Sequence, residues 1–469
     1  MKVEQLYTAC LSEMAYYIES DGEAAIIDPL RETKPYLEKL KENKAKLKYV
    51  FLTHFHADFV SGQVDLAKAT GATIVFGPNA NPNYDFHSAK DLERFKIGSL
   101  ELELLHTPGH TMESSSYVLI DKDGNKPYVF TGDCLFIGDV GRPDLAVKSE
   151  MTVEDLAGHL FDSLRNKIMP LPDSITVYPN HGAGSACGKN MSKETFDTLG
   201  NQKKVNYALN PELSKADFIK EVTFGLAQPP QYFPENVRMN KQVNKSYQEV
   251  LANGTKAIQI DTFASLAAQN DVLVLDTREG KAYKQTGTIP GAWYIGIDGG
   301  FAPWVGALLK DINQKILILG DDHRIEEVVT RLSRVGYDNT LGYLEGGFDA
   351  WKNSGREISA IGTYSPEETI AELGVNNSKT ILDVRKPSEF DAEHVEGIET
   401  FPLDTMLSNL TKLDPKQNFI LHCQSGYRSL IAASIMKANG FEQVIDVTGG
   451  FKALVASGAK TTDFVCTNS

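Results

Sequence analysis

The segment YVFLTHFHADF (Tyr49–Phe59) joins an apolar run to a loop that holds two histidines and an aspartate. The apolar run predicts a buried strand, and the polar residues after it would lie in the loop at the strand's end. Three further segments share this arrangement: TPGH ends at His110, FTGD ends at Asp133 and YPNH ends at His181. Because each follows a β-like run, we expect all four segments to meet at one edge of a β-sandwich.

The region that holds these segments alternates β-rich runs with helical stretches up to about residue 225, a pattern typical of an α/β layered fold. The β-rich runs cover residues 24–27, 49–52, 73–76, 117–120, 128–130 and 175–178. A polar stretch with several prolines follows at residues 225–248. That stretch predicts a linker or a strap across a neighbouring surface.

The rest of the chain contains two copies of one plan. Residues 272–292 and 380–398 each predict a strand that ends in Asp-x-Arg, then a short helix and a glycine turn. Residues 316–355 and 419–458 continue the match, and each includes a Gly-Gly-Phe triplet. Since strands alternate with helices, the copies predict two tandem α/β domains with parallel sheets. We place the three domains at residues 1–240, 255–360 and 362–465.

Composition narrows the range of partners and compartments. With 47 basic and 62 acidic side chains the net charge is −15, so no domain-wide positive field would attract nucleic acid. No apolar run reaches the roughly 18 residues of a membrane helix, and the first residues lack a signal-peptide pattern. The five cysteines are widely spaced without a Cys-x-x-Cys pair, which fits a reducing compartment. We expect a cytoplasmic protein with no nucleic-acid or membrane partner.

In combination, the HxHxD loop, the TPGHT and TGD segments and the late histidine resemble the metallo-β-lactamase superfamily. The resemblance covers about the first 220 residues and implies an αββα sandwich with a metal site at its edge. Binuclear hydrolases of that superfamily read HxHxDH, whereas Phe59 replaces the last histidine here. A second metal ion would therefore lack one of its ligands. A mononuclear site with two imidazoles, one carboxylate and open positions is the arrangement that non-haem Fe(II) prefers.

Among the mononuclear iron members, the sequence most resembles the persulfide dioxygenases. The resemblance implies one Fe(II) per chain, held by His54, His110 and Asp133. It also implies a homo-oligomer, and it assigns the residues around the ligands to orienting those ligands or water through hydrogen bonds. These surrounding residues are His56, Asp58 and His181.

Substrate contacts are expected from two further segments of the same region. The stretch GDCLFIGDVGRPDLA (residues 132–146) is also similar to the persulfide dioxygenases, which implies that Arg142 and Asp144 lie near the substrate pocket. Cys187 lies in the loop HGAGSACGK, whose small residues predict exposure. Cys187 is a candidate substrate contact or an inert thiol, and the sequence leaves its orientation open.

A second reactive group is predicted in the last copy of the repeat. The buried strand 419–422 leads into Cys423, and the loop through Arg428 curls into a helix that we expect to begin near Ser429. A thiol at a helix N-terminus faces free N–H groups and the positive end of the helix dipole, which favours the thiolate. The nearby Arg428 adds positive charge, and we expect Cys423 and Arg428 to be catalytic. Ser425 and Gly426, inside this loop, are expected to bind substrate.

The spacing Cys-x4-Arg closes a smaller loop than the Cys-x5-Arg loop that binds phosphate in tyrosine-phosphatase-like enzymes, and a persulfide sulfur fits it better. With the Asp-x-Arg and Gly-Gly-Phe segments, the last domain resembles a rhodanese. The resemblance implies sulfur transfer through a Cys423 persulfide. The middle copy has no cysteine: Gly320 aligns with Cys423, or Leu319 if the Gly-aromatic turns are matched instead. It is therefore expected to be an inactive rhodanese-like domain.

Taken together, the chain resembles a fused persulfide dioxygenase and rhodanese. The resemblance implies that a low-molecular-weight thiol persulfide is oxidised by O2 to sulfite and free thiol. Sulfur transfer at Cys423 would link sulfite and thiosulfate, in a direction that the sequence leaves open. One alternative is a metal-dependent thioester hydrolase of the glyoxalase II type fused to a sulfurtransferase, against which Phe59 counts. Another alternative is a redox-sensing or sulfur-carrier protein in which the sandwich is only a binding module.

Overall fold

The computed structural model describes residues 1–145, 151–373 and 379–465, and the chain divides into two compact units. Unit 1 comprises Met1–Tyr247 with Ser333–Gly336, and unit 2 comprises Gln248–Leu332 with Tyr337–Ser469. The expected first domain, 1–240, falls in unit 1. The expected domains 255–360 and 362–465 fall in unit 2 apart from the four residues 333–336, so the two repeats form one compact body.

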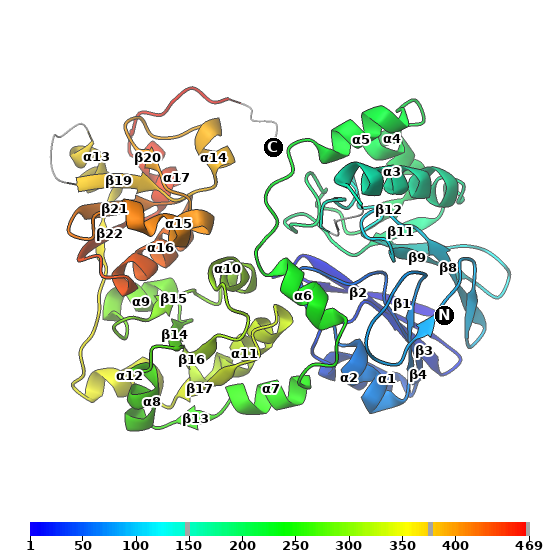
Figure 1. The fold of residues 1–469 in the computed structure, drawn as a ribbon, viewed down its shortest axis with the longest axis horizontal. Helices are drawn as coiled ribbons and strands as arrows, with labels where there is room; N and C mark the ends of the chain where they lie inside the picture. The colour runs from blue at the N-terminus through cyan, green and yellow to red at the C-terminus, as the bar shows by residue number, and fades with distance from the viewer. Residues whose placement is uncertain (146–150, 374–378, 466–469) are drawn as a thin grey trace. The chain divides into compact units, whose positions relative to one another are not determined.

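Unit 1 contains two six-stranded sheets, each of mixed strand direction (Figure 1). The first has the order β1 (Lys2–Thr8), β2 (Glu13–Ser20), β3 (Glu23–Ile27), β4 (Lys46–Phe51), β5 (Thr73–Phe76) and β6 (His87–Ser88). The second has the order β12 (Asp197–Thr198), β11 (Thr176–Pro179), β10 (Tyr128–Gly132), β9 (Ser115–Ile120), β8 (Leu100–His106) and β7 (Arg94–Ile97). Each of the six β-rich runs expected from the sequence overlaps one of these strands, and Leu52 and Ile175 each lie one residue outside.

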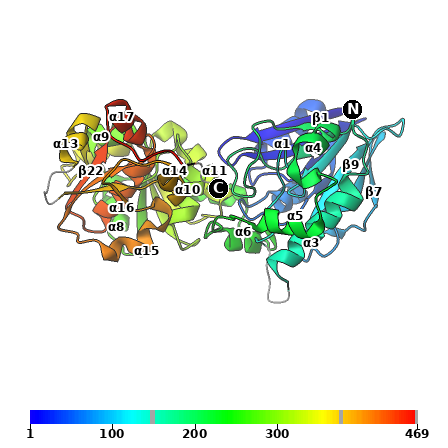
Figure 2. The same ribbon diagram turned by 90° about the horizontal axis from the view of Figure 1, so that it is seen from above.

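The two sheets pack face to face, and helices cover their outer faces. Alternation along the strands explains the layers: in β2, Tyr16 and Ile18 enter the core between the sheets, while Ala15 and Tyr17 pack toward the helices. Helices α1 (Lys34–Asn43) and α2 (Gln63–Thr70) cover the first sheet. The second sheet is covered by α3 (Val153–Ser163), a π-helical turn (Leu164–Ile168), α4 (Leu199–Val205) and α5 (Lys215–Thr223). Figure 2 shows α3 and α5 side by side. The expected αββα sandwich is confirmed.

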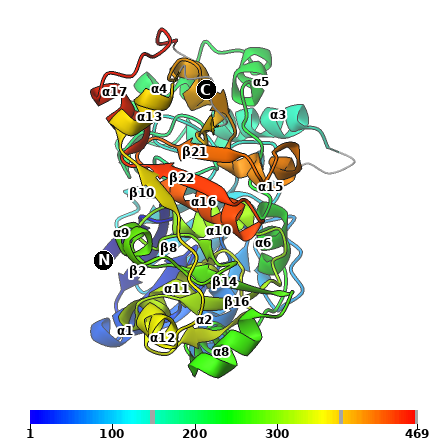
Figure 3. The ribbon, with the colours of Figure 1, turned by 90° about the vertical axis from the view of Figure 1, so that its left-hand side faces the viewer.

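Unit 2 contains two five-stranded parallel sheets with the same strand order. The middle repeat has β13 (Ala257–Ile258), β17 (Thr340–Leu344), β16 (Lys315–Leu319), β14 (Val272–Asp276) and β15 (Trp293–Tyr294). The last repeat has β18 (Gly362–Tyr364), β22 (Gln443–Val447), β21 (Asn418–His422), β19 (Lys379–Asp383) and β20 (Glu399–Thr400). Figure 3 shows β21 and β22 side by side. The shared order confirms that the two copies have the same fold, with parallel sheets.

Helices connect the strands of both repeats. Those of the middle repeat are α8 (Ile260–Ala267), α9 (Gly280–Thr286), α10 (Phe301–Leu308), α11 (Ile325–Arg334) and α12 (Gly347–Asn353). Those of the last repeat are α13 (Pro366–Glu372), α14 (Pro387–Ala392), α15 (Met406–Asn409), α16 (Tyr427–Ala438) and α17 (Gly450–Ala456). None of the helices in the described ranges combines the length and apolarity that a bilayer crossing requires.

Strand register settles which residue of the middle repeat replaces the cysteine. Asp276 of β14 pairs with Leu319 of β16, and Asp383 of β19 pairs with His422 of β21. Leu319 is therefore the counterpart of His422, and Gly320 stands at the position of Cys423.

The proline-containing stretch 225–248 contains helix α6 (Phe233–Asn240) and the first two residues of α7 (Tyr247–Gly254). We expected only a linker or a strap there. Pro234, within the first two positions of α6, is compatible with a helix start, which explains why a proline-rich stretch can hold this helix. Asn240, at its end, is 2% exposed and contacts the histidine loop, so the stretch does serve as a strap within unit 1.

Candidate metal centre and cysteine loop

Two histidines and an aspartate from three strand-end segments converge in unit 1. The ligand atoms of His54, His110 and Asp133 all lie within 4.8 Å of one another, and all three residues are buried. Nε2 of His110 is 3.4 Å from Asp133 Oδ2, and Nε2 of His54 is 3.8 Å from the same oxygen. The sandwich brings them together because His54 follows β4 and Asp133 follows β10, one strand from each sheet. This is the group that we expected to bind the metal.

The other ring nitrogen of each histidine is held so that Nε2 is free to coordinate. His110 Nδ1 lies 2.8 Å from the carbonyl oxygen of Arg142, which can only accept, so Nδ1 carries the proton. His54 Nδ1 lies 2.9 Å from Thr53 Oγ1, and that hydroxyl donates its hydrogen to Asp28 Oδ2 at 2.8 Å. Thr53 therefore accepts from His54 Nδ1. Both rings turn Nε2 toward Asp133, the orientation that metal ligation requires.

Burial and charge prepare this group for a cation. Burial and the neighbouring imidazoles of His56, His110 and His181 hold the pKa of His54 well below its usual value, so its ring is neutral. Both carboxylate oxygens of Asp133 are buried and accept no hydrogen bond from the described residues. A buried carboxylate without donors is costly unless a cation neutralises it. The residues present therefore fit a metal ion bound by two imidazoles and one carboxylate.

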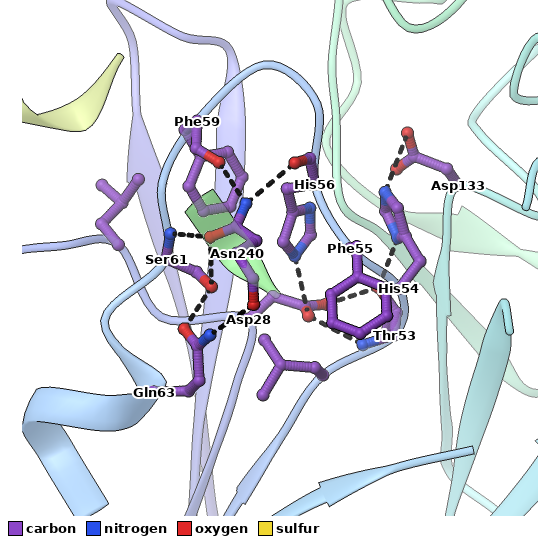
Figure 4. A network of polar contacts seen from close by, with 12 residues as sticks. Asp28, Thr53, His54, Phe55, His56, Phe59, Ser61, Gln63, Asp133 and Asn240 are labelled. Carbon is purple, nitrogen blue, oxygen red and sulfur yellow. Dashed lines mark hydrogen bonds and ion pairs between the residues drawn. The ribbon is translucent and has the colours of Figure 1, made fainter. Parts of the chain in front are cut away.

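Asp28, at the end of β3, organises the histidine loop and was not singled out from the sequence (Figure 4). Its Oδ1 accepts from Thr53 N at 2.8 Å and lies 3.0 Å from His56 Nε2. Burial opposes protonation of His56, but the carboxylate of Asp28 outweighs it and raises the pKa of that ring. A strand that ends in Asp was the available signal. It was too common a pattern to distinguish Asp28.

A second group of potential ligands lies beside the first. His56, Asp58 and His181 also have ligand atoms within 4.8 Å of one another, and His181 Nε2 is 3.6 Å from both Asp58 Oδ2 and Asp133 Oδ1. We expected these residues to hydrogen-bond the first group, but the nitrogens of His181 make no hydrogen bond within the described part of the chain. Phe59 is fully buried and stacks on His56, with ring centroids 4.3 Å apart. The position of the missing histidine is thus filled by an apolar ring.

The strap holds the histidine loop through one buried side chain. Asn240 Nδ2 donates to the carbonyl oxygens of His56 at 2.8 Å and Phe59 at 2.7 Å, and Asn240 Oδ1 accepts from Ser61 N at 2.9 Å. Figure 4 shows this amide between the two sides of the loop. Nothing local in the sequence signals this role, because about 180 residues separate the partners.

Arg142, Asp144 and Cys187 lie close to the metal group, with two departures from expectation. The Arg142 side chain forms an ion pair with Asp144, with Nε–Oδ1 and Nη2–Oδ2 distances of 2.6 Å, so its charge is already paired. The part of Arg142 that contacts His110 is its backbone carbonyl oxygen. Cys187 is 1% exposed, although its loop predicted exposure. Its sulfur shares a cluster with Asp133 and His181, so it faces the site. Burial, with the nearby carboxylates of Asp58 and Asp133, raises the pKa of the Cys187 thiol well above its usual value.

Cys423 lies at the N-terminus of α16, whose twelve residues begin at Tyr427, two residues before the expected start. The backbone N–H of Gly426 donates to Cys423 Sγ at 3.1 Å, and Ser429 Oγ lies 3.6 Å from the same sulfur. Gly426 has a φ of 102°, a conformation that lets the loop turn its amide inward and that favours glycine. An amide donor and a helix N-terminus at the sulfur both stabilise negative charge there.

Arg428 is held beside the loop by an ion pair. Its Nη1 donates to Glu389 Oε2 at 2.5 Å, and its Nη2 donates to Glu389 Oε1 at 2.8 Å. Arg385 pairs with buried Asp383, lies over the Phe451 ring at 4.0 Å, and donates to Gln424 Oε1 at 3.2 Å. The Asp-x-Arg and Gly-Gly-Phe motifs thus meet under the cysteine loop.

The middle repeat keeps this frame without the thiol. Arg278 pairs with Asp276 and lies over the Phe348 ring at 4.2 Å, as the corresponding residues of the last repeat do. A Cβ at Gly320 would lie 2.7 Å from Thr277 Oγ1. Of the remaining cysteines, Cys134 is buried and Cys10 is half-buried; Cys466 lies outside the described residues.

Comparison with known families agrees with this architecture. The family described as "Metallo-beta-lactamase superfamily" matches residues 9–181, and the family described as "Rhodanese-like domain" matches residues 259–354 and 365–457. A probable hydroxyacylglutathione hydrolase, glo2, from Schizosaccharomyces pombe is 32% identical over 198 residues, which cover 41% of this chain and 72% of the relative. The chain belongs to the metallo-β-lactamase superfamily.

Solved structures resemble this superfamily member over larger parts of its length. The crystal structure of a metallo-β-lactamase from Staphylococcus aureus subsp. aureus COL is 31% identical with a TM-score of 0.64, and covers 73% of this chain and 98% of that one. The crystal structure of ETHE1 from Myxococcus xanthus is 28% identical with a TM-score of 0.44, and covers 51% of this chain and 98% of that one. The two family matches show that the chain joins a metallo-β-lactamase domain to two rhodanese-like domains.

Proposed function

We propose that the first domain oxidises a low-molecular-weight thiol persulfide with O2 at one Fe(II) held by His54, His110 and Asp133. The observation that carries the proposal is the buried group of two histidines and one carboxylate, in which the Nδ1 atoms of both histidines are engaged. That donor set, with positions left open, suits non-haem Fe(II). The balanced reaction is R–S–SH + O2 + H2O → R–SH + SO3²⁻ + 2 H⁺, in which the outer sulfur is oxidised and O2 is reduced.

The residues of the chain give this site its selectivity. Iron bound there would supply the redox chemistry that lets O2 react with sulfur. Phe59 and the buried loop around His56 limit water at the position where hydrolases hold a second metal. Cys187, protonated and facing Asp133, presents a sulfur surface at the edge of the group, where it contacts the persulfide.

The last domain is proposed to exchange sulfur through Cys423. The thiolate attacks the outer sulfur of a persulfide, the S–S bond breaks, and the carrier leaves as a thiolate while Cys423 holds the sulfur. Sulfite then attacks that sulfur: Cys423–S–S⁻ + SO3²⁻ → Cys423–S⁻ + S2O3²⁻. The Gly426 amide and the α16 N-terminus stabilise the charge on sulfur in both steps. Tethering raises the local concentration of the shared sulfite.

A second candidate function is thioester hydrolysis by the first domain, since a relative with 32% identity is named as a hydroxyacylglutathione hydrolase. The second group, His56, Asp58 and His181, would have to hold the additional metal ion. His56 Nε2 lies 3.0 Å from Asp28 Oδ1, which leaves its Nδ1 available to a metal, but Phe59 supplies no ligand, so this second group has one protein ligand fewer than the HxHxDH pattern provides.

Product analysis separates these functions. Given glutathione persulfide and O2, the wild-type protein should form both sulfite and thiosulfate, and Cys423→Ser should accumulate sulfite without thiosulfate. Hydrolysis of S-lactoylglutathione without O2 uptake would instead support the hydrolase. Thiosulfate formation that survives Cys423→Ser would refute the assigned transfer step.

A further inference from the structure

The cysteine loop of the last repeat borders a pocket of about 820 Å³ whose walls come from both repeats of unit 2. The last repeat contributes Ser425, Gly426 and Tyr427 of the loop. The middle repeat contributes the start of α9, from Glu279 to Gln285. Gly426, whose backbone N–H donates to Cys423 Sγ, is therefore part of the pocket wall.

Four contacts fix the two walls against each other. The Tyr427 hydroxyl donates to the Gly296 carbonyl oxygen at 2.8 Å, and a Cβ at Gly299 would lie 2.2 Å from Tyr427 Cζ, so the tyrosine ring lies directly on the Gly299 backbone. The backbone N–H of Tyr294 donates to Ser434 Oγ of α16 at 2.9 Å. Lys284 of α9 pairs with the buried carboxylate of Asp446. The middle repeat thus supports the helix that begins at the reactive cysteine.

Charges lining the pocket divide into paired and unpaired groups. Arg278 is neutralised by Asp276, Lys284 by Asp446, and Asp298 by Arg324. Lys281 and Glu279 are both exposed, and in the described part of the chain neither makes an ion pair. The start of α9 therefore offers one cation and one carboxylate to a ligand.

The size of the pocket selects among sulfur compounds. Sites for whole small molecules measure roughly 300–1,000 Å³, and this pocket falls within that range. Sulfite and thiosulfate are far smaller and need only the loop itself. A volume of this size beside the loop suits a thiol whose body extends away from its sulfur.

We infer that this pocket binds the body of the thiol that brings sulfur to Cys423, a low-molecular-weight thiol persulfide whose body carries both carboxylate and ammonium groups. The inference rests on the proposed function for the transfer step itself. Lys281 would bind a carboxylate and Glu279 an ammonium group. The middle repeat, which lacks a cysteine, would then be the carrier-binding half of the sulfur-transfer site, positioning the outer sulfur over the loop for attack by Cys423.

Binding can be measured without turnover by using thioethers that cannot transfer sulfur. S-methylglutathione, which carries both charges, would be titrated into the full chain, with the polyanionic S-methyl-coenzyme A as the comparison. All three tryptophans (Trp293, Trp304 and Trp351) belong to the middle repeat, so a change in tryptophan fluorescence reports binding there and not at the metal group.

Lys281→Glu should weaken the binding of S-methylglutathione about tenfold, because it places a carboxylate beside the carboxylate of the ligand. Lys352→Glu, at an exposed lysine of α12 away from the pocket, is the matched control and should change the Kd less than twofold.

A second variant tests the wall without changing charge. Gly299→Ala forces the Tyr427 ring to move, and it should also weaken the binding of S-methylglutathione. Equal Kd values for wild type, Lys281→Glu and Gly299→Ala would overturn the inference, and so would tighter binding of S-methyl-coenzyme A than of S-methylglutathione. Failure of the proposed function is read separately, as absence of Cys423-dependent thiosulfate formation in a protein that still binds the thioether.

Discussion

Replacing Asn240 with alanine should release the loop that carries His54 without touching any metal ligand. The side chain makes three buried hydrogen bonds of 2.7–2.9 Å to the backbone of that loop. At about 1 kcal/mol for each bond, their loss lowers the free energy of local opening by about 3 kcal/mol. Because 1.4 kcal/mol corresponds to tenfold, the loop should open about 100-fold more often.

Hydrogen exchange measures this opening directly in the full-length protein. The amides of residues 56–63, Ser61 above all, should exchange about 100-fold faster in Asn240→Ala than in wild type. Asn201→Ala is the matched control: its exposed amide bonds only to Asp197 on the surface, so exchange at residues 56–63 should not change. A metal ion bound by His54, His110 and Asp133 should also be lost faster to a chelator from Asn240→Ala than from wild type. Unchanged exchange at residues 56–63 would refute the assignment of the strap.

Three further predictions concern Asp28, Glu389 and Gly320. Asp28→Ala removes the acceptor that orients Thr53 and His56, and metal affinity measured by chelator competition should fall about 10–100-fold, whereas Asp121→Ala in an exposed turn should leave it unchanged. Burial opposes ionisation of Glu389, but Arg428 outweighs it and lowers the pKa of that carboxyl, so the pair stabilises the fold above the unfolded pKa of about 4.3. This stabilisation is lost as the pH falls through the folded pKa. The Tm of wild type should therefore drop more between pH 6 and pH 3 than that of Glu389→Gln, and equal drops would contradict this. Gly320→Cys in a Cys423→Ser background should not restore sulfur transfer, since the new Cβ meets Thr277 Oγ1 at 2.7 Å; recovered thiosulfate formation would show that the middle repeat lost only its thiol.

The sequence predicts those parts of the site that depend on the ends of strands. His54, His110 and Asp133 each follow a strand or its turn, and the strand ends of a layered fold converge, so their meeting could be expected from local patterns. Strand periodicity likewise predicts both parallel sheets of unit 2. The choice between Gly320 and Leu319 needed the register of β14 with β16, which local sequence leaves ambiguous.

The remaining parts depend on tertiary contacts that have no local pattern. Asn240 reaches the histidine loop from a stretch that looked like a linker. Cys187 is buried by the segments around its loop, although glycine, alanine and serine neighbours predict exposure. Arg428 was expected to act on Cys423 through its charge, but that charge is shared with Glu389 from α14. The pocket beside Cys423 depends on how two repeats pack, which periodicity within each repeat does not encode.

The most direct test of the central claim is the metal content of anaerobically purified protein together with its O2 uptake on adding glutathione persulfide, in wild type, His110→Ala and His87→Ala. His87 is exposed on β6 and pairs with Glu93, so its variant controls for loss of a histidine elsewhere in unit 1. About one iron per chain, with uptake abolished in His110→Ala and retained in His87→Ala, is the predicted result. About two zinc ions per chain and no uptake in wild type would contradict the dioxygenase and favour the thioester hydrolase.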